Sequence, residues 1–221
     1  QKAIAGYRKA ADDNPDPIWK KRSLEYLAAA YGPDKLNDPA KAEPVYKEII
    51  SLDPSDTTNY LQLAKLYEDA GRYDEAEAQY NKALAVKADD PAVLEAVAGF
   101  YNRQGEFDKT IDALTKAANL SPNNPEGWHR IAAFYEDEAS KDSRLNDAQK
   151  KDYILKGIDM DNKALKLNPD YVDAMIYENI LLRLQARVEK DPAKQKDLMN
   201  KAQQLYDKAM DLRNRKQTGK G

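Results

Sequence analysis

The stretch LAKLYEDAGRYDEAEAQYNKAL, residues 63–84, decides the fold of this chain. Large apolar residues and alanines recur in it at intervals of three and four residues, on both sides of Gly71. This spacing places them on one face of a helix, and a glycine between two such segments is typical of a turn. The stretch therefore predicts a pair of antiparallel helices. The small residues let the helix axes approach, and the large ones fill the gaps beside them.

The same pattern returns after 34 residues, so that Tyr67 is followed by Tyr101 and Gly71 by Gly105. A fixed period of this length in helix–turn–helix units is the signature of the tetratricopeptide repeat, and the chain resembles this family over nearly its whole length. The unit at 57–90 matches the family pattern through Tyr60, Leu63, Ala64, Tyr67, Ala76, Tyr80, Ala83 and Ala88. The unit at 91–124 matches it through Leu94, Val97, Ala98, Tyr101, Thr110, Leu114, Ala117 and Pro122.

The resemblance implies an all-α fold, a right-handed superhelical solenoid of antiparallel helix pairs. We expect a single solenoid over residues 1–221. Its parts are the second helix of a truncated repeat at 1–15, helix pairs at 18–54, 57–90, 91–124, 125–171 and 172–216, and a disordered tail at 217–221.

The last two pairs are expected to be elongated. Insertions at 139–151 and 186–196 lack a turn glycine and are rich in charge and in good helix formers. They predict longer helices joined by a polar turn, with about one and a half extra turns per helix at ~3.6 residues per turn. Two interpretations stay open: a family variation without function, or an edge for docking or dimer contact.

Two residues of the 125–171 pair depart from the family pattern. Asp161 stands where the family has a large apolar residue, and Gly157 stands where it has alanine. We therefore expect either weaker packing between the helices there or a different register.

Composition excludes several classes of function. The net charge is −3 and the isoelectric point about 5.4, so no general attraction to nucleic acid is expected. The chain has no cysteine, which excludes disulfides and thiolate metal sites, and it suits the cytoplasm and the periplasm equally. No apolar run approaches the ~20 residues of a membrane-spanning helix, so no membrane insertion is expected.

The residues also argue against catalysis and against a cofactor. His129 is the only histidine, so no catalytic triad or histidine-rich metal site can be assembled around it. The acidic runs at 136–138 and 159–162 lack the spacing of a calcium loop, and we interpret them as solvated helix faces. We therefore expect that the chain has no enzymatic activity and binds no cofactor and no metal ion.

The resemblance also implies where a partner would bind, because the first helix of each repeat lines the concave face of the family's superhelix. Positions carried over from the family pattern predict a groove formed by Tyr26, Gln62, Lys65, Glu95, Asn102, Arg103, His129, Arg130, Tyr177 and Arg183. The clamp with which some members hold a C-terminal carboxylate is not supported, because Thr58, Leu61 and Gly99 stand at equivalent positions.

The expected function is a scaffold that binds another protein or a peptide in this groove. The alternative is the repeat region of a larger enzyme or of a bacterial envelope or secretion assembly complex, since fold does not fix function. Self-association through the long C-terminal hairpins is a further possible interaction.

Overall fold

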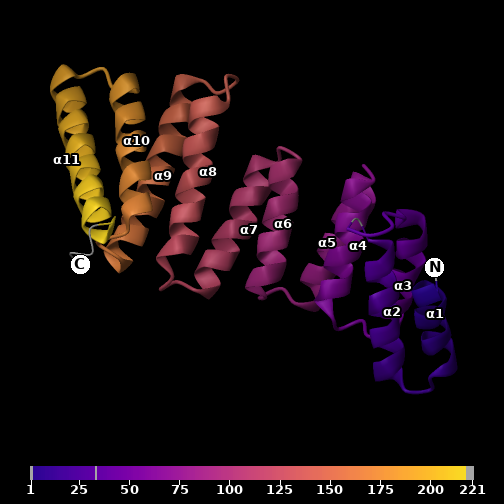
Figure 1. Ribbon diagram of the computed structural model, residues 1–221. Coiled ribbons are helices and arrows are strands. Elements are labelled where there is room, and N and C mark those ends of the chain that lie inside the picture. The colour runs from indigo at the N-terminus through magenta and orange to yellow at the C-terminus, as the bar shows by residue number, and fades with distance from the viewer. Residues whose placement is uncertain (1, 33, 218–221) are drawn as a thin grey trace. The chain divides into compact units, whose positions relative to one another are not determined.

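The computed structural model describes residues 2–32 and 34–217, and all regular structure in these ranges is α-helical (Figure 1). Eleven helices occur in this part of the chain. They form two compact units, residues 1–100 and residues 101–221. Each unit is built of helices that pack against their neighbours in sequence. The prediction of an all-α chain of consecutive helix pairs is confirmed.

The first unit contains five complete helices and most of a sixth. They are α1 (Lys2–Asp13), α2 (Pro17–Tyr31), α3 (Pro39–Leu52), α4 (Thr57–Asp69), α5 (Tyr73–Val86) and α6 (Pro91–Arg103), the last of which continues into the second unit. Within the unit α1 packs on α2, α2 on α3, α3 on α4, and α4 on α5. One hydrophobic cluster joins α1, α2 and α3 through Ala11, Leu24, Leu27, Ala28, Val45 and Ile49.

The stretch that opens at Leu63 forms the α4–α5 hairpin. Its alanines at 64, 76 and 83 are fully buried, which lets the two helix axes approach. Tyr67 and Tyr80 are buried beside them, and each hydroxyl donates a hydrogen bond to a glutamate, Glu43 (3.0 Å) and Glu68 (3.2 Å) respectively. The alternation of small and large residues therefore packs one helix on the other, as the sequence predicts.

Glycines end α4 and α6 in the same way. Gly71 and Gly105 have φ angles of 71° and 74°, in the left-handed region that other residues rarely adopt. After Gly71 the Arg72 amide donates to the Tyr67 carbonyl (2.8 Å), which is the six-to-one bond of a Schellman cap. The equivalent bond after Gly105 reaches the Tyr101 carbonyl at 2.9 Å. The 34-residue period of the sequence thus fixes a repeated turn.

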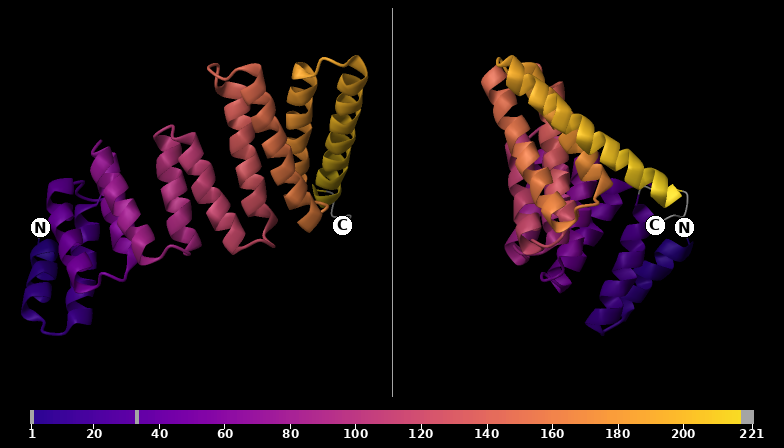
Figure 2. Two further views of the ribbon diagram at one scale, coloured as in Figure 1. Left: turned by 180° about the vertical axis from the view of Figure 1, so that it is seen from behind. Right: turned by 90° about the vertical axis from the view of Figure 1, so that its left-hand side faces the viewer.

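The second unit contains the longer helices. They are α7 (Phe107–Leu120), α8 (Pro125–Lys141), α9 (Asp147–Leu167), α10 (Val172–Val188) and α11 (Pro192–Gln217). Within the unit α7 packs on α8, α8 on α9, α9 on α10, and α10 on α11, and α8 also contacts α10. Helices α10 and α11 pack against each other, and they lie side by side in the left-hand view of Figure 2.

Helices α8 to α11 have 17, 21, 17 and 26 residues, compared with 13 and 14 for α4 and α5. The prediction of lengthened helices in the last two pairs is therefore confirmed. The polar turn between α8 and α9 ends in a capping box, in which Asn146 and Gln149 each accept the other's backbone N–H at 3.0 Å. No helix in the described ranges combines the length and apolarity needed to cross a membrane.

Packing at Gly157 is close rather than weak, so the first of the two alternatives expected there, weaker packing between the helices, is wrong. A Cβ atom there would lie 2.9 Å from Cδ1 of Leu181 on α10 and 3.3 Å from Cβ of Tyr135 on α8. Leu181 is completely buried. The absence of a side chain at Gly157 lets α10 approach α9, so this glycine serves a close helix contact.

Candidate functional site

A hydrogen bond between two mostly buried side chains joins α8 and α9 in the second unit. Nδ1 of His129 lies 2.8 Å from Oδ1 of Asp161, whose side chain is 0% exposed, whereas that of His129 is 13% exposed. The other carboxyl oxygen, Oδ2, is buried without a hydrogen-bond partner among the described residues. Burial raises the pKa of Asp161 to about 6, although the bond to His129 acts in the opposite direction.

A second buried carboxyl group lies on α10. Glu178 is 9% exposed, and burial together with the nearby charge of Asp161 raises its pKa to about 7. Two carboxylates in a site of low dielectric constant disfavour each other's ionisation, so near neutral pH the pair retains a proton. Three helices thus contribute one titratable group each: His129 from α8, Asp161 from α9 and Glu178 from α10.

Two tyrosines flank the histidine. The ring of His129 meets Tyr171 edge-on at 5.2 Å between centroids and Tyr177 at 5.0 Å, with interplanar angles of 73° and 84°. Tyr171 immediately precedes α10, and Tyr177 lies on it. The pKa of the Tyr171 hydroxyl is raised by burial and then by the charges of Asp173, Glu126 and Asp161. Three carboxylates therefore act on the Tyr171 hydroxyl.

Tyr171 also lines a cleft of about 400 Å³. Helix α10 contributes Asp173 and Ile176 to its lining, and α11 contributes Arg213 and Lys216. One wall is therefore acidic and aromatic, and the opposite wall is basic. In the described part of the chain no three histidine, aspartate or glutamate side chains are grouped so that they could hold a metal ion.

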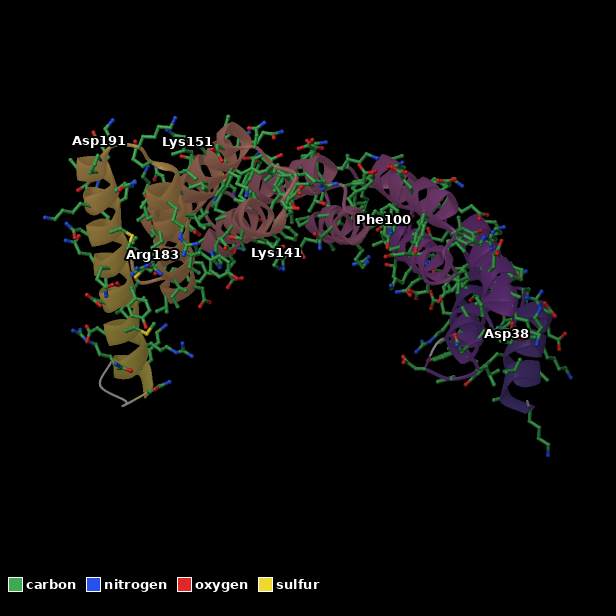
Figure 3. All side chains as sticks on the ribbon, turned by 90° about the horizontal axis from the view of Figure 1, so that it is seen from above. Asp38, Phe100, Lys141, Lys151, Arg183 and Asp191 are labelled. Carbon is green, nitrogen blue, oxygen red and sulfur yellow. The ribbon has the colours of Figure 1, made fainter. Side chains whose placement is uncertain are left out.

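The structure brings two of the ten predicted groove residues, His129 and Tyr177, into direct contact. Arg183 points instead into the space between α10 and α11, where it donates to Asn179 (2.8 Å) and to Gln203 (2.9 Å) (Figure 3). Arg130, Asn102 and Arg103 are exposed on α8 and α6.

The four predicted groove residues of the first unit are Tyr26, Gln62, Lys65 and Glu95. Tyr26 on α2 stacks on Tyr7 of α1 at 5.5 Å between ring centroids. Lys65 pairs with Asp69 one turn along α4, at 2.6 Å. Gln62 lies on the same helix, and Glu95 lies on α6. All four side chains are exposed.

A separate ion network surrounds a cleft of about 470 Å³ between α3 and the end of α4. Glu43 accepts hydrogen bonds from Lys47 and Arg72, both at 2.6 Å, and from the Tyr67 hydroxyl. These bonds, with Lys47 first and Arg72 second, lower the pKa of Glu43 to about 2. The Arg72 guanidinium lies over the Tyr67 ring, 4.3 Å from its centroid. Through Arg72 and Glu43 the network links the α4–α5 turn to α3.

The sequence analysis does not identify Asp161 and Glu178 as parts of a functional site. In the sequence Asp161 stands out only as a departure from the family pattern. In the register of that pattern, Glu178 occupies a position that normally holds leucine, and this substitution is the available signal. A polar residue at a core position requires a partner, so two such residues in adjacent repeats indicate a shared polar cluster.

Comparisons with known proteins agree with this architecture. Residues 35–99 match the sequence profile described as tetratricopeptide repeat. No curated protein sequence matches the chain. The crystal structure of MamA has a TM-score of 0.57 at 18% identity, over 82% of this chain and 92% of that one.

Two further structures are described as tetratricopeptide-repeat proteins. YrrB, reported to have an unusual peptide-binding site, has a TM-score of 0.58 at 18% identity, over 93% of this chain and 91% of its own. A protein from Parabacteroides merdae has a TM-score of 0.57 at 18% identity, over 87% and 72%. At such identities the likeness shows the fold alone, and the predicted tetratricopeptide-repeat fold is confirmed.

Proposed function

We propose that this chain, which carries the tetratricopeptide-repeat fold and matches the repeat in sequence over residues 35–99, is a scaffold that binds another protein or a peptide without catalysis. The fold generally mediates protein–protein interaction. Within each unit the partner would lie on the face built by the first helices of the pairs, α2 and α4 in the first unit and α8 and α10 in the second.

One observation carries the proposal. The rings of His129 on α8 and Tyr177 on α10, the first helices of neighbouring pairs, meet with 5.0 Å between their centroids. First helices of adjacent repeats therefore contribute to one shared patch of aromatic and polar side chains. Such a patch suits a helix or an extended peptide that crosses several repeats.

The remaining groove residues support a polar rather than an apolar contact. Lys65 and Glu95 carry opposite charges and are exposed, on α4 and α6 respectively. The Lys65–Asp69 pair is also exposed, and pairs of this kind contribute little to stability, so a partner can replace them at small cost. YrrB is a protein of this fold with a described peptide-binding site, which favours a peptide as the class of partner.

Site-specific photo-crosslinking tests which face binds. A benzophenone amino acid is placed singly at Gln62, Asn102 or Arg130, exposed residues on α4, α6 and α8. The matched controls are Lys82, Lys116 and Asp152, exposed residues on the second helices α5, α7 and α9. All six full-length variants are irradiated in lysate of the source organism.

The expected result is the same crosslinked protein from the first three positions and none from the controls. Crosslinking from the control positions alone, or equally from both sets, would contradict binding by the first-helix face. Melting temperatures of the six variants establish that the probe has not disturbed the fold.

A further inference from the structure

A third cleft, of about 580 Å³, lies within the second unit between α7 and α9. Helix α8 forms its floor, and the second helices α7 and α9 form its two walls. The volume is in the range of roughly 300–1,000 Å³ that is usual for small-molecule sites, which are mostly apolar with a few polar groups. We call it the α7–α9 cleft.

The floor of the α7–α9 cleft is apolar and held in place. It consists of Trp128, Ile131 and Tyr135, all of them buried. The indole Nε1 of Trp128 donates a hydrogen bond to the carbonyl of Pro122 (3.0 Å), and the Tyr135 ring meets Phe107 edge-on at 5.5 Å between centroids. A ligand therefore meets a surface that is already ordered, which lowers the entropic cost of binding.

The walls add apolar side chains along α9 and polar ones on α7. Leu155, 44% exposed, and the partly buried Met160 come from α9. Thr115 and Asn119 come from α7, and their side chains form no hydrogen bond within residues 2–32 and 34–217. The α9 wall runs from Leu155 to Lys163, which at ~1.5 Å per residue is about 12 Å, close to the length of an extended chain of roughly ten carbon atoms.

The charges of the α7–α9 cleft are arranged unequally along it. Lys163 pairs with Asp159 at 3.1 Å, and both residues line the cleft. The Lys163 ammonium also lies 4.9 Å from the centroid of the Trp128 ring. Lys156 lines the cleft too, but its partner Asp152, at 2.8 Å, does not. The Lys156 end is therefore positive, whereas charges are balanced at the Trp128 end.

We propose that the α7–α9 cleft binds an amphiphilic carboxylate, a small organic acid with an unbranched apolar chain. Its carboxylate lies at Lys156, and its chain runs along α8 to Trp128. The Lys156–Asp152 pair has exposed fractions of 49% and 56%, so it contributes little to stability and the ligand carboxylate replaces Asp152 at small cost. At the other end the chain packs on the indole and on the aliphatic stem of Lys163.

This inference goes beyond the proposed function, because it assigns a small ligand to the side of the second helices. It does not depend on a protein partner. It also fixes a direction: an anionic head at the middle of α9 and an apolar end at the start of α8. A measurement that locates the two ends of a bound ligand therefore tests it directly.

The tryptophans of the chain offer such a measurement. There are two, Trp128 on the floor of the cleft and Trp19 in the first unit. In full-length Trp19→Phe, Trp128 is the only indole, and a bromine atom quenches its fluorescence only on contact. The probes are 10-bromodecanoate, 2-bromodecanoate and the uncharged 10-bromodecan-1-ol, each below the concentration at which it forms micelles. Trp128→Phe, which retains Trp19, reports nonspecific quenching.

Two variants in this background test the lining. Lys156→Gln removes the positive charge at the proposed head, and Thr115→Phe places a ring in the cleft from a partly exposed position on α7. Lys116→Gln is the matched control. Lys116 pairs with Asp112 one turn away at 2.7 Å, as Lys156 does with Asp152, but it does not line the cleft. Melting temperatures establish that each variant is folded.

We expect saturable quenching of Trp128 by 10-bromodecanoate and none of Trp19. 2-Bromodecanoate should quench little, because its bromine stays near Lys156, but it should displace the first probe and so restore the fluorescence. Lys156→Gln and the uncharged alcohol should each bind roughly three- to tenfold more weakly, as for the loss of one partly exposed charge-assisted contact. Thr115→Phe should abolish the quenching, and Lys116→Gln should leave it unchanged.

Several results would overturn the inference. Equal affinity for the alcohol, or unchanged affinity in Lys156→Gln, would show that the charge has no part in binding. Equal quenching by the two bromo acids would contradict the direction of the chain, and equal quenching of Trp19 would show nonspecific partition. If no probe quenches Trp128 while a protein is crosslinked at Lys116, a protein partner covers the cleft instead. Lys156→Gln changes an exposed side chain, so it remains informative if Thr115→Phe fails to fold.

Discussion

His129 and Asp161 are joined by a 2.8 Å hydrogen bond between α8 and α9, in which the aspartate side chain is completely buried and the histidine side chain is 13% exposed. The bond links a predicted groove residue to a titratable cluster inside the second unit. Glu178 on α10 completes that cluster. The stability of this unit is therefore tied to pH.

The pH dependence of stability is the first prediction. A carboxyl group whose pKa is higher in the folded than in the unfolded state stabilises the fold at low pH, and this contribution is lost as the pH rises through the folded pKa. Glu178 has a pKa of about 7 in the fold against 4.5 for the free group. We expect stability to fall from pH 5 to pH 8 in the wild type. Glu178→Gln should be about 2–3 kcal/mol more stable than the wild type at pH 8, and this advantage should vanish near pH 4.

Urea denaturation at pH 4, 5 and 8 measures this effect. Asp197→Asn is the control, because its carboxylate is exposed and its removal should leave the pH profile unchanged. An advantage of Glu178→Gln that is the same at all three pH values would show that the glutamate acts through packing and not through its proton.

The turn glycine of α4 gives the second prediction. Gly71 has a φ of 71°, and a Cβ atom added there would have nothing within 4 Å, so alanine meets backbone strain but no clash. Gly71→Ala should destabilise the chain by about 1 kcal/mol. Gly6→Ala, inside α1 and also in open space, should instead stabilise it by about 0.5–1 kcal/mol. Thermal unfolding compares the two variants with the wild type. Changes in melting temperature of the same sign would contradict the distinct backbone roles of the two glycines.

The close approach of α9 and α10 gives the third prediction. A methyl group at Gly157 would lie 2.9 Å from Leu181 Cδ1, inside the packed core. Gly157→Ala should therefore destabilise the second unit by about 1–3 kcal/mol. Adding Leu181→Val, which shortens the opposing side chain, should recover part of the loss. The free energies of unfolding of the single and double variants test this contact. Full additivity of the two changes would argue against a direct contact between residues 157 and 181.

The Glu43 network of the first unit gives the fourth prediction. Its lysine and arginine partners lower the pKa of Glu43 to about 2, so its stabilising contribution is present above the free value of 4.5 and is lost as the pH falls toward 2. Glu43→Gln should cost only about 1 kcal/mol at pH 7, because Lys47 and Arg72 are partly exposed and solvent screens the ion pairs. The cost should shrink in 1 M salt and disappear near pH 2. A loss of stability that is independent of both salt and pH would show that the effect comes from the Tyr67 hydrogen bond and not from the ion pairs.

The sequence predicts the helical framework well because that framework depends on local chemistry. Gly71 and Gly105 mark turns through a conformation that favours glycine, and the buried alanines mark helix contacts through their size. These signals recur at a fixed period, so each repeat supports the interpretation of the next. The extra length of α8 to α11 follows equally from charged segments without a turn glycine.

The polar cluster could not be predicted because it depends on register between helices. His129 and Asp161 lie 32 residues apart, with the lengthened turn between them, and their contact requires knowing how far α9 is displaced along α8. Glu178 adds a third helix. Gly157 could not be interpreted from the sequence for the same reason. A glycine in place of alanine suggested loose packing, whereas in the fold Leu181 of the neighbouring helix fills the space.

Affinity for the crosslinked partner tests the scaffold account most directly. Calorimetry would compare the wild type with Arg130→Ala/Tyr177→Ala, on the first helices α8 and α10, and with Lys116→Ala/Tyr73→Ala, on the second helices α7 and α5. We expect at least a tenfold loss of affinity, about 1.4 kcal/mol, for the first pair of substitutions and no change for the second. Equal affinities in all three proteins, with equal melting temperatures, would contradict binding by the first-helix face.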